Sequence, residues 1–351
     1  MSKMIEKKKI KGLLKEAVKQ WHTYVPQKHI GGDVLIAPLP EEAKELEAAL
    51  DNISLADDDL VISPKDIFFP QLETMFKFKK GEIAETVESS PKLLFGIKSC
   101  DLKGILFADE FFKRDFEDAY YLSRANERLI VVIGCINPPR PGACFCTSAK
   151  TGPFAEKGFD LQLVDNGESY FVETGSEKGE EFVAKYSGFF QDESGDAEKA
   201  VNSIKAKAEK AVELKIEFQK ALDLMANDDF IPEEKYKRIG ERCVYCGACV
   251  YTCPTCTCFN VFDNAKGDEG TRVRIWDACI FEGYTREASG HNPRNQKWLM
   301  ACRRYEHKLK YDKAKTNMSG CVGCGRCLAS CPVDIGMSKF VQEITEDKKI
   351  M

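Results

Sequence analysis

The first half of the chain alternates between short apolar runs and amphipathic stretches. Residues 5–21 have the periodicity of an amphipathic helix, and the apolar run 33–38 precedes a charged helical stretch over 41–50. Two further apolar runs, 92–97 and 129–133, are typical of fully buried strands. This order of elements predicts an α/β domain in the N-terminal half of the chain.

Both buried strands are followed by cysteines. After the first strand we expect a helix over residues 102–112, capped by Ser99 or Asp101, and after the second strand a loop. If the strands run parallel, the residues that follow them lie at one edge of the sheet, where α/β folds place their sites. Four cysteines are then expected near this edge: Cys100, Cys135, Cys144 and Cys146.

These four cysteines could bind an iron–sulfur cluster, and we favour this interpretation over four unrelated core thiols. A free cysteine often behaves as a small buried hydrophobic residue. However, Cys144 and Cys146 stand one residue apart in a predicted loop, and loops carry binding residues more often than cores do.

The middle of the chain predicts a hairpin and then a helical connection. Residues 160–176 have the pattern of a β-hairpin that turns at 165–167. Residues 177–200 are charged, and residues 201–227 have the composition of one long helix. The aromatic segment 64–80 lacks a helical period, so we expect it to be a packed connection.

The last third of the chain contains one cysteine spacing twice, Cys-x2-Cys-x2-Cys-x3-Cys-Pro. This is the spacing of bacterial ferredoxins with two [4Fe–4S] clusters, in which the fourth cysteine of each copy ligates the cluster of the other copy. We therefore expect a first cluster on Cys243, Cys246, Cys249 and Cys331. The second cluster is expected on Cys321, Cys324, Cys327 and Cys253.

Zinc is the alternative metal that such cysteines could bind. Zinc sites usually combine two Cys-x2-Cys pairs in one tetrahedron, and eight cysteines in a duplicated arrangement fit that poorly. Gly247, Gly323 and Gly325 lie between the ligands, where a missing side chain lets backbone N–H groups approach sulfur.

A long segment separates Cys253 of the first copy from Cys321 of the second, and it includes an insertion. It contains Cys256, Cys258, Cys279 and Cys302, whose irregular spacing is compatible both with a further cluster and with core thiols. We predict an α+β fold with an N-terminal α/β domain, a helical connector and a ferredoxin-like domain that holds two [4Fe–4S] clusters. The expected bounds are 1–190, 191–240 and 241–351, with the insertion at 259–318.

Composition and charge narrow the class of protein. Sixteen cysteines in 351 residues without an apolar leader indicate a reducing compartment, so we expect a cytoplasmic protein without a membrane span. The net charge of −5 divides into −9 for residues 1–240 and +4 for residues 241–351. Two thiolate-ligated clusters would offset this positive excess, which makes nucleic-acid binding a poor interpretation.

Motifs for bond-making chemistry are missing. The sequence contains no dinucleotide-binding, P-loop, nucleophile-elbow or zinc-protease motif, and its four histidines are scattered. We therefore name no catalytic residue and expect a protein that carries electrons.

Several longer stretches of the sequence resemble those of a known family. They include the first motif through Phe259, the segment Trp276 to Cys279, the string Gly290 to Arg294, and the residues around Cys100, Cys135 and Cys144. Together they resemble the iron–sulfur β subunit of soluble sulfhydrogenases, and the corresponding iron–sulfur subunit of anaerobic sulfite reductase is similar. The resemblance covers most of the chain from about residue 65 onward.

The resemblance implies an electron-transfer subunit of a cytoplasmic multi-subunit oxidoreductase in an anaerobe. Its expected partners are a flavin- and NAD(P)-binding reductase subunit and a catalytic redox subunit of hydrogenase, sulfite reductase or heterodisulfide-reductase-like type. The alternative is that this chain is itself the catalytic subunit, with a substrate or flavin bound at the cysteine-bearing edge of its N-terminal domain.

Overall fold

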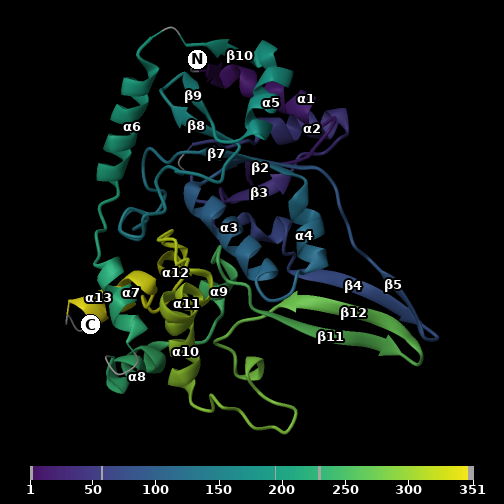
Figure 1. The fold of residues 1–351 in the computed structure, drawn as a ribbon, viewed down its shortest axis with the longest axis vertical. Coiled ribbons are helices and arrows are strands. Elements are labelled where there is room, and N and C mark those ends of the chain that lie inside the picture. The colour runs from purple at the N-terminus through teal and green to yellow at the C-terminus, as the bar shows by residue number, and fades with distance from the viewer. Residues whose placement is uncertain (1–2, 57, 194, 228–230, 347–351) are drawn as a thin grey trace.

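The computed structural model describes residues 3–56, 58–193, 195–227 and 231–346. A large mixed sheet with helices on both faces forms one part of the molecule, and a helical, cysteine-rich part lies against it (Figure 1). A second, smaller sheet projects from the body. The predicted α+β fold, with an α/β part followed by a ferredoxin-like region, is confirmed.

The large sheet has eight strands in the order β10-β1-β9-β8-β7-β6-β2-β3. They are β1 (Lys3–Glu6), β2 (His22–Lys28), β3 (Val34–Pro38), β6 (Lys92–Ile97), β7 (Arg128–Ile133), β8 (Leu161–Asp165), β9 (Ser169–Thr174) and β10 (Phe190–Asp192). The central pairs β2–β6, β6–β7 and β7–β8 are parallel, whereas the outer pairs are antiparallel. The predicted buried strands and the hairpin are therefore present.

Helices cover both faces of this sheet. One face packs on α1 (Ile10–Ala17), which follows η1 (Lys7–Lys9), and on α2 (Ala43–Asp51), α5 (Glu177–Lys185) and η3 (Ser187–Phe189). The other face packs on α3 (Ser99–Lys113) and α4 (Ala119–Asn126). Along β6, Leu93 and Phe95 face the first core and Leu94 the second, which is the alternation expected of a strand buried on both faces.

The N-terminal helix begins later than its periodicity predicts. Residues 3–6 form β1, which pairs with β9 and β10, and the α-helix starts only at Ile10. Ile5 is fully buried in this sheet, so pairing between two strands outweighs the local helical preference.

The smaller sheet joins two distant segments of the chain. Its order is β11-β12-β4-β5, with β4 (Leu72–Lys79), β5 (Glu82–Glu85), β11 (Phe259–Lys266) and β12 (Glu269–Trp276). The segment predicted as a packed connection instead forms η2 (Pro64–Ile67) and β4. Phe76 and Phe78 stand two residues apart in β4, so their side chains point to the same face of the sheet, and both residues pair with β12.

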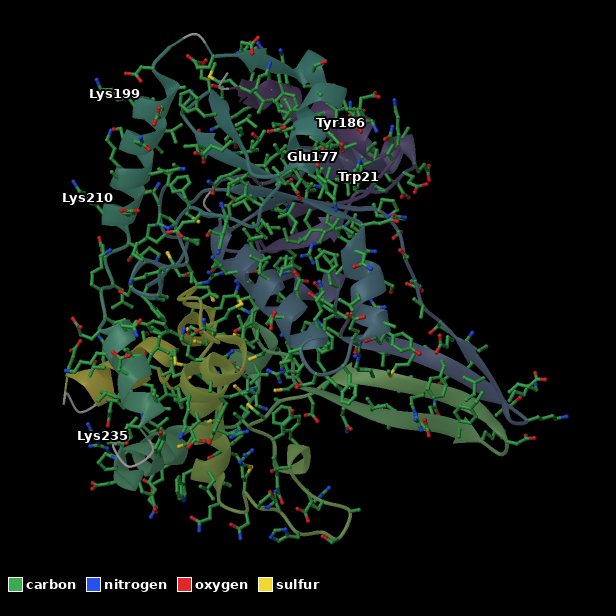
Figure 2. The ribbon with its side chains drawn as sticks, viewed as in Figure 1. Trp21, Glu177, Tyr186, Lys199, Lys210 and Lys235 are labelled. Carbon is green, nitrogen blue, oxygen red and sulfur yellow. The ribbon has the colours of Figure 1, made fainter. Side chains whose placement is uncertain are left out.

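The predicted long helix of the connector is two helices. These are α6 (Ala197–Ala211) and α7 (Phe218–Ala226). Lys199 and Lys210 point outward from α6 (Figure 2). After α6 the chain turns to the cysteine-bearing loop, where the Ile216 N–H donates to Ser148 Oγ at 3.1 Å. Val212 is buried at this break, so tertiary packing ends the helix.

Short helices build the cysteine-rich part. They are α8 (Glu233–Arg242), α9 (Ala248–Tyr251), η4 (Glu282–Tyr284), α10 (Lys297–Glu306), the π-helical turn η5 (His307–Tyr311), α11 (Asp312–Thr316), α12 (Arg326–Ala329) and α13 (Met337–Thr345). Their core centres on Tyr305, Phe340 and Met337, which are buried together with α7. Among the described residues, no helix has both the length and the apolar character needed to cross a membrane.

Candidate functional site

The first cysteine motif lines a cavity of about 460 Å³, counted with its open mouth. The cysteines that line it are Cys243, Cys246, Cys249, Cys327 and Cys331. Three cysteines of the first copy thus meet the fourth cysteine of the second copy. This is the juxtaposition that crossed ligation requires.

Backbone groups of the first motif point at its sulfur atoms. The Tyr245 N–H donates to Cys243 Sγ at 3.4 Å, and the Ile335 N–H donates to Cys331 Sγ at 3.5 Å. Tyr245 and Gly247 have φ of 55° and 80°, and these left-handed residues turn the chain between successive cysteines. N–H donors of this kind stabilise thiolate ligands and tune their redox potential.

A buried arginine lies at the same cavity. Arg304 lines the cavity and is 3 % exposed, and its Nε has no hydrogen-bond partner among the described residues. A buried guanidinium N–H needs an acceptor. A thiolate-ligated cluster in the cavity would bring negative charge and sulfur acceptors, so these residues fit a [4Fe–4S] cluster.

The second motif is more deeply buried. Cys321, Cys324 and Cys327 are each less than a tenth exposed, and the Met337 N–H donates to Cys327 Sγ at 3.4 Å. Burial, together with the neighbouring Cys253 thiol, raises the pKa of Cys324 to about 11. Cys253 is also buried, and it approaches the second motif through the residues that follow it.

Hydrogen bonds fix this approach of Cys253. Thr255 Oγ1 donates to the Gly320 carbonyl at 2.5 Å, and Lys308 Nζ donates to both groups, at 2.8 and 2.9 Å. The residues that follow Cys253 are thereby joined to the residue that precedes Cys321. Burial alone would lower the pKa of Lys308, but the Cys253 and Cys256 thiols outweigh this effect and raise it.

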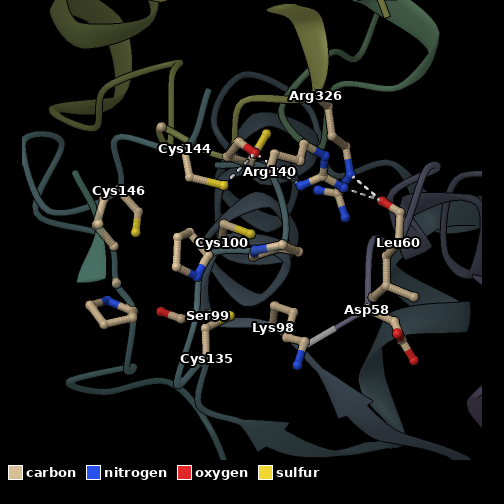
Figure 3. Close-up of a pocket in the computed structure, with 17 residues that line it drawn as sticks. Asp58, Leu60, Lys98, Ser99, Cys100, Cys135, Arg140, Cys144, Cys146 and Arg326 are labelled. Carbon is tan, nitrogen blue, oxygen red and sulfur yellow. Dashed lines mark hydrogen bonds between the residues drawn. The ribbon is translucent and has the colours of Figure 1, made fainter. Parts of the chain in front are cut away.

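The four N-terminal cysteines also share a cavity. It measures about 480 Å³ with its mouth, and the cysteines that line it are Cys100, Cys135, Cys144, Cys146 and Cys324 (Figure 3). Strands β6 and β7 are parallel, as predicted, and place Cys100 and Cys135 at one edge of the sheet. The helix cap was predicted wrongly: Lys98 is the N-cap, and Asp101 inside the helix instead pairs with Arg326.

The loop that carries Cys144 and Cys146 is joined to the second motif. The Phe145 N–H donates to the Gly323 carbonyl at 2.8 Å, and Arg140 Nη1 donates to the Cys324 carbonyl at 3.0 Å. Thr151 Oγ1 donates to the Val322 carbonyl at 2.6 Å. The N-terminal cavity therefore lies at the boundary between the large sheet and the ferredoxin-like region.

Comparisons with known proteins agree with this geometry. Residues 242–335 match the family model of the 4Fe-4S dicluster domain. The sulfhydrogenase 2 subunit beta of Pyrococcus furiosus is 32% identical over 300 residues, which span 85% of this chain and 87% of that one. The chain belongs to the family of sulfhydrogenase beta subunits. The predicted resemblance and the two [4Fe–4S] clusters are confirmed, and this member of the family is an iron–sulfur electron-transfer protein.

The four further cysteines between the two motif copies lie in two places in this beta-subunit chain. Cys256, Cys258 and Cys279 lie with Cys253 in one buried group. Cys302 lies apart from them, and its thiol donates to the Tyr236 carbonyl at 3.4 Å. The structure therefore does not bring these four cysteines together.

Sequence reasoning missed the buried cations that surround these thiols. Lys65 is 5 % exposed, donates to the Cys256 carbonyl at 2.9 Å and lies 4.1 Å from the centre of the Trp276 ring. Burial lowers the pKa of Lys65. The sequence around Lys65, like that around Arg304 and Lys308, contains no signal that distinguishes a buried cation from a surface one.

The geometry around these thiols differs from that of a mononuclear metal site. Within the described ranges, no three His, Cys, Asp or Glu side chains converge on one point that a metal ion could occupy. The cysteines of the two sets instead line two cavities, one for each set.

Proposed function

We propose that this chain relays electrons between a flavin- and nucleotide-binding reductase subunit and a catalytic redox subunit of a cytoplasmic, hydrogenase-type complex. Membership of the sulfhydrogenase beta-subunit family supports this proposal, because the relative's name describes one subunit of a sulfhydrogenase. None of the sixteen cysteines, all of which lie within the described residues, forms a disulfide, as a reducing compartment favours.

The proposed ligands are the two crossed sets. Cys243, Cys246, Cys249 and Cys331 hold the first cluster, and Cys321, Cys324, Cys327 and Cys253 hold the second. When bound, each [4Fe–4S] cluster supplies a site for one-electron oxidation and reduction. The chain orients the thiolates, donates N–H groups to sulfur and keeps water from the second set.

The observation that carries the proposal is the contrast in exposure between the sets. Cys246 is exposed, and the neighbouring Val244 is 56 % exposed, so the first site reaches the surface. The second set is enclosed. An exposed apolar residue beside a ligand suits contact with a redox partner, whereas an enclosed set suits electron storage and passage inside the protein.

The experiment is anaerobic reduction and reoxidation of the full chain, followed by electron paramagnetic resonance. The relay predicts that both clusters are reduced reversibly and that their reduced signals are magnetically coupled. If the clusters break down on reduction, their role is only to stabilise the fold. If the protein binds zinc in place of iron, the proposal is wrong. Flavin absorbance or dye turnover by the isolated chain would favour the catalytic alternative.

A further inference from the structure

Four cysteines outside the matched dicluster domain lie around one cavity. They come from three separate places: the start of α3 after β6, the end of β7, and the loop that follows. Figure 3 shows Cys100, Cys135, Cys144 and Cys146 around this space. We propose that these four cysteines bind a third [4Fe–4S] cluster, between the large sheet and the second cysteine motif.

The size and chemistry of the cavity match those of the first ferredoxin-type site. The two cavities measure about 480 and 460 Å³, each counted with its mouth. Each is lined by four cysteines of one set and by one further cysteine of the second motif, Cys324 in one and Cys327 in the other. The donor set and the space that accommodate a cluster at the first motif are therefore repeated at the sheet edge.

Ordinary core thiols are arranged differently. Protein interiors are close-packed, and a buried free cysteine fills space against its neighbours. Cys302 illustrates this case: it is 3 % exposed and lines neither cavity. Four thiols from three segments around a common unfilled space are not explained by packing.

The charges at the cavity suit an anionic group. Lys98, Arg140 and Arg326 line it, together with the carboxylate of Asp58. Arg326 forms a buried ion pair with Asp101 at 2.7 and 3.0 Å, and Arg140 also contacts Asp59. A four-thiolate [4Fe–4S] centre carries about two negative charges, which these cations would partly balance.

The proposed cluster would extend the chain of redox sites toward the N-terminal domain. Cys324 lines the N-terminal cavity and Cys327 lines the cavity of the first motif, and both belong to the second motif. The second motif therefore lies between the other two sites. One end of the series is the loop of residues 136–142 and the other is the exposed Cys246. This binding proposal stands whether or not the relay proposed above is correct.

The test is the iron content of the full chain, reconstituted anaerobically with iron and sulfide. Cys135→Ser should hold about four iron atoms fewer per chain than the unaltered protein, because one [4Fe–4S] cluster is lost. The electron paramagnetic resonance signals of the ferredoxin-type pair should persist. The control is Cys302→Ser, a buried cysteine outside both cavities, which should keep the full iron content.

A second variant keeps the test decisive. Cys146→Ser, in the loop, should lose the same amount of iron, and the double variant should lose no more than either single variant, since both residues serve one cluster. Equal iron in Cys135→Ser, Cys146→Ser and Cys302→Ser would overturn the proposal. A double variant that lost twice the iron of the single variants would also contradict it.

Discussion

The two copies of the cysteine motif have the same spacing but different neighbours. Val244 and Val322 occupy the same position in the two copies, yet Val244 is 56 % exposed and Val322 is 4 % exposed. The first copy faces solvent on this side, whereas the second copy faces the N-terminal cysteine loop. One local sequence pattern thus serves an outer and an inner site, and the tertiary contacts decide which is which.

The residues between the cysteines follow this difference. Tyr245 and Gly323 are equivalent and share a left-handed backbone, with φ of 55° and 65°. A Cβ added at Gly323 would lie 2.8 Å from the backbone of Cys146, so only the second copy requires glycine there. Ala248 of the first copy corresponds to Arg326 of the second, which reaches Asp101 of α3.

The largest expected effect is the loss of one whole cluster, and the two variants below should lose different clusters. Cys253→Ser should damage the cluster of the second motif, and Cys331→Ser that of the first, because ligation is crossed. Each variant should lose about four iron atoms per chain. Iron analysis combined with electron paramagnetic resonance of the surviving cluster measures this. Loss of the cluster nearer in sequence to the replaced cysteine would show that ligation is not crossed.

The next effect concerns the ion pair that only the inner copy makes. Asp101→Ala leaves Arg326 buried without its partner, and we expect a loss of about 3–5 kcal/mol in the free energy of unfolding. Denaturant unfolding under anaerobic conditions measures this loss. Asp115→Ala is the control, since Asp115 is largely exposed beside Arg114 and its loss should cost less than about 1 kcal/mol. Equal costs would mean that the inner pair does not stabilise the domain contact.

A smaller effect compares equivalent glycines. Gly325→Ala places a Cβ 2.7 Å from the backbone of Ala143, whereas Gly247→Ala meets the ring atoms of Phe281 and Tyr251, which can move. Both glycines have positive φ, so the strain in the backbone is similar. We expect Gly325→Ala to be less stable than Gly247→Ala by about 1–3 kcal/mol. The same denaturant unfolding measurement ranks the stabilities of the two variants. A reversed order would contradict the close approach of Gly325 to the backbone of Ala143.

The smallest structural effect is expected at the outer copy. Val244→Asp should change the stability by less than about 0.5 kcal/mol and leave the iron content unchanged, because the side chain is exposed. It should slow electron exchange with the redox partner by on the order of tenfold, since a charge replaces an apolar contact. Stopped-flow reduction of the clusters in the native complex measures the rate. Ile30→Asp, at another exposed apolar position, should leave the rate unchanged.

Much of the candidate site could be predicted from local pattern. The repeated spacing located the eight ferredoxin-type cysteines, and two buried strands followed by cysteines located the N-terminal four. The predicted elements failed where distant contacts compete with local preference: residues 3–6 pair as a strand, the connector helix breaks near Val212, and residues 72–79 join a sheet with the insertion. Periodicity reports which face of an element is apolar but not what covers it.

The sequence by itself determined the chemistry of the sites, because metal ligation depends on residue type and on short spacings that a local turn can close. It also determined the buried strands and the hairpin, whose signals lie within a few residues. Only the tertiary structure decided that Cys144 approaches the Cys324 carbonyl, to 3.6 Å, and that Arg304 and Lys308 are buried beside thiols. Such contacts join residues far apart in the chain, and their stability comes from the packing of whole elements against each other.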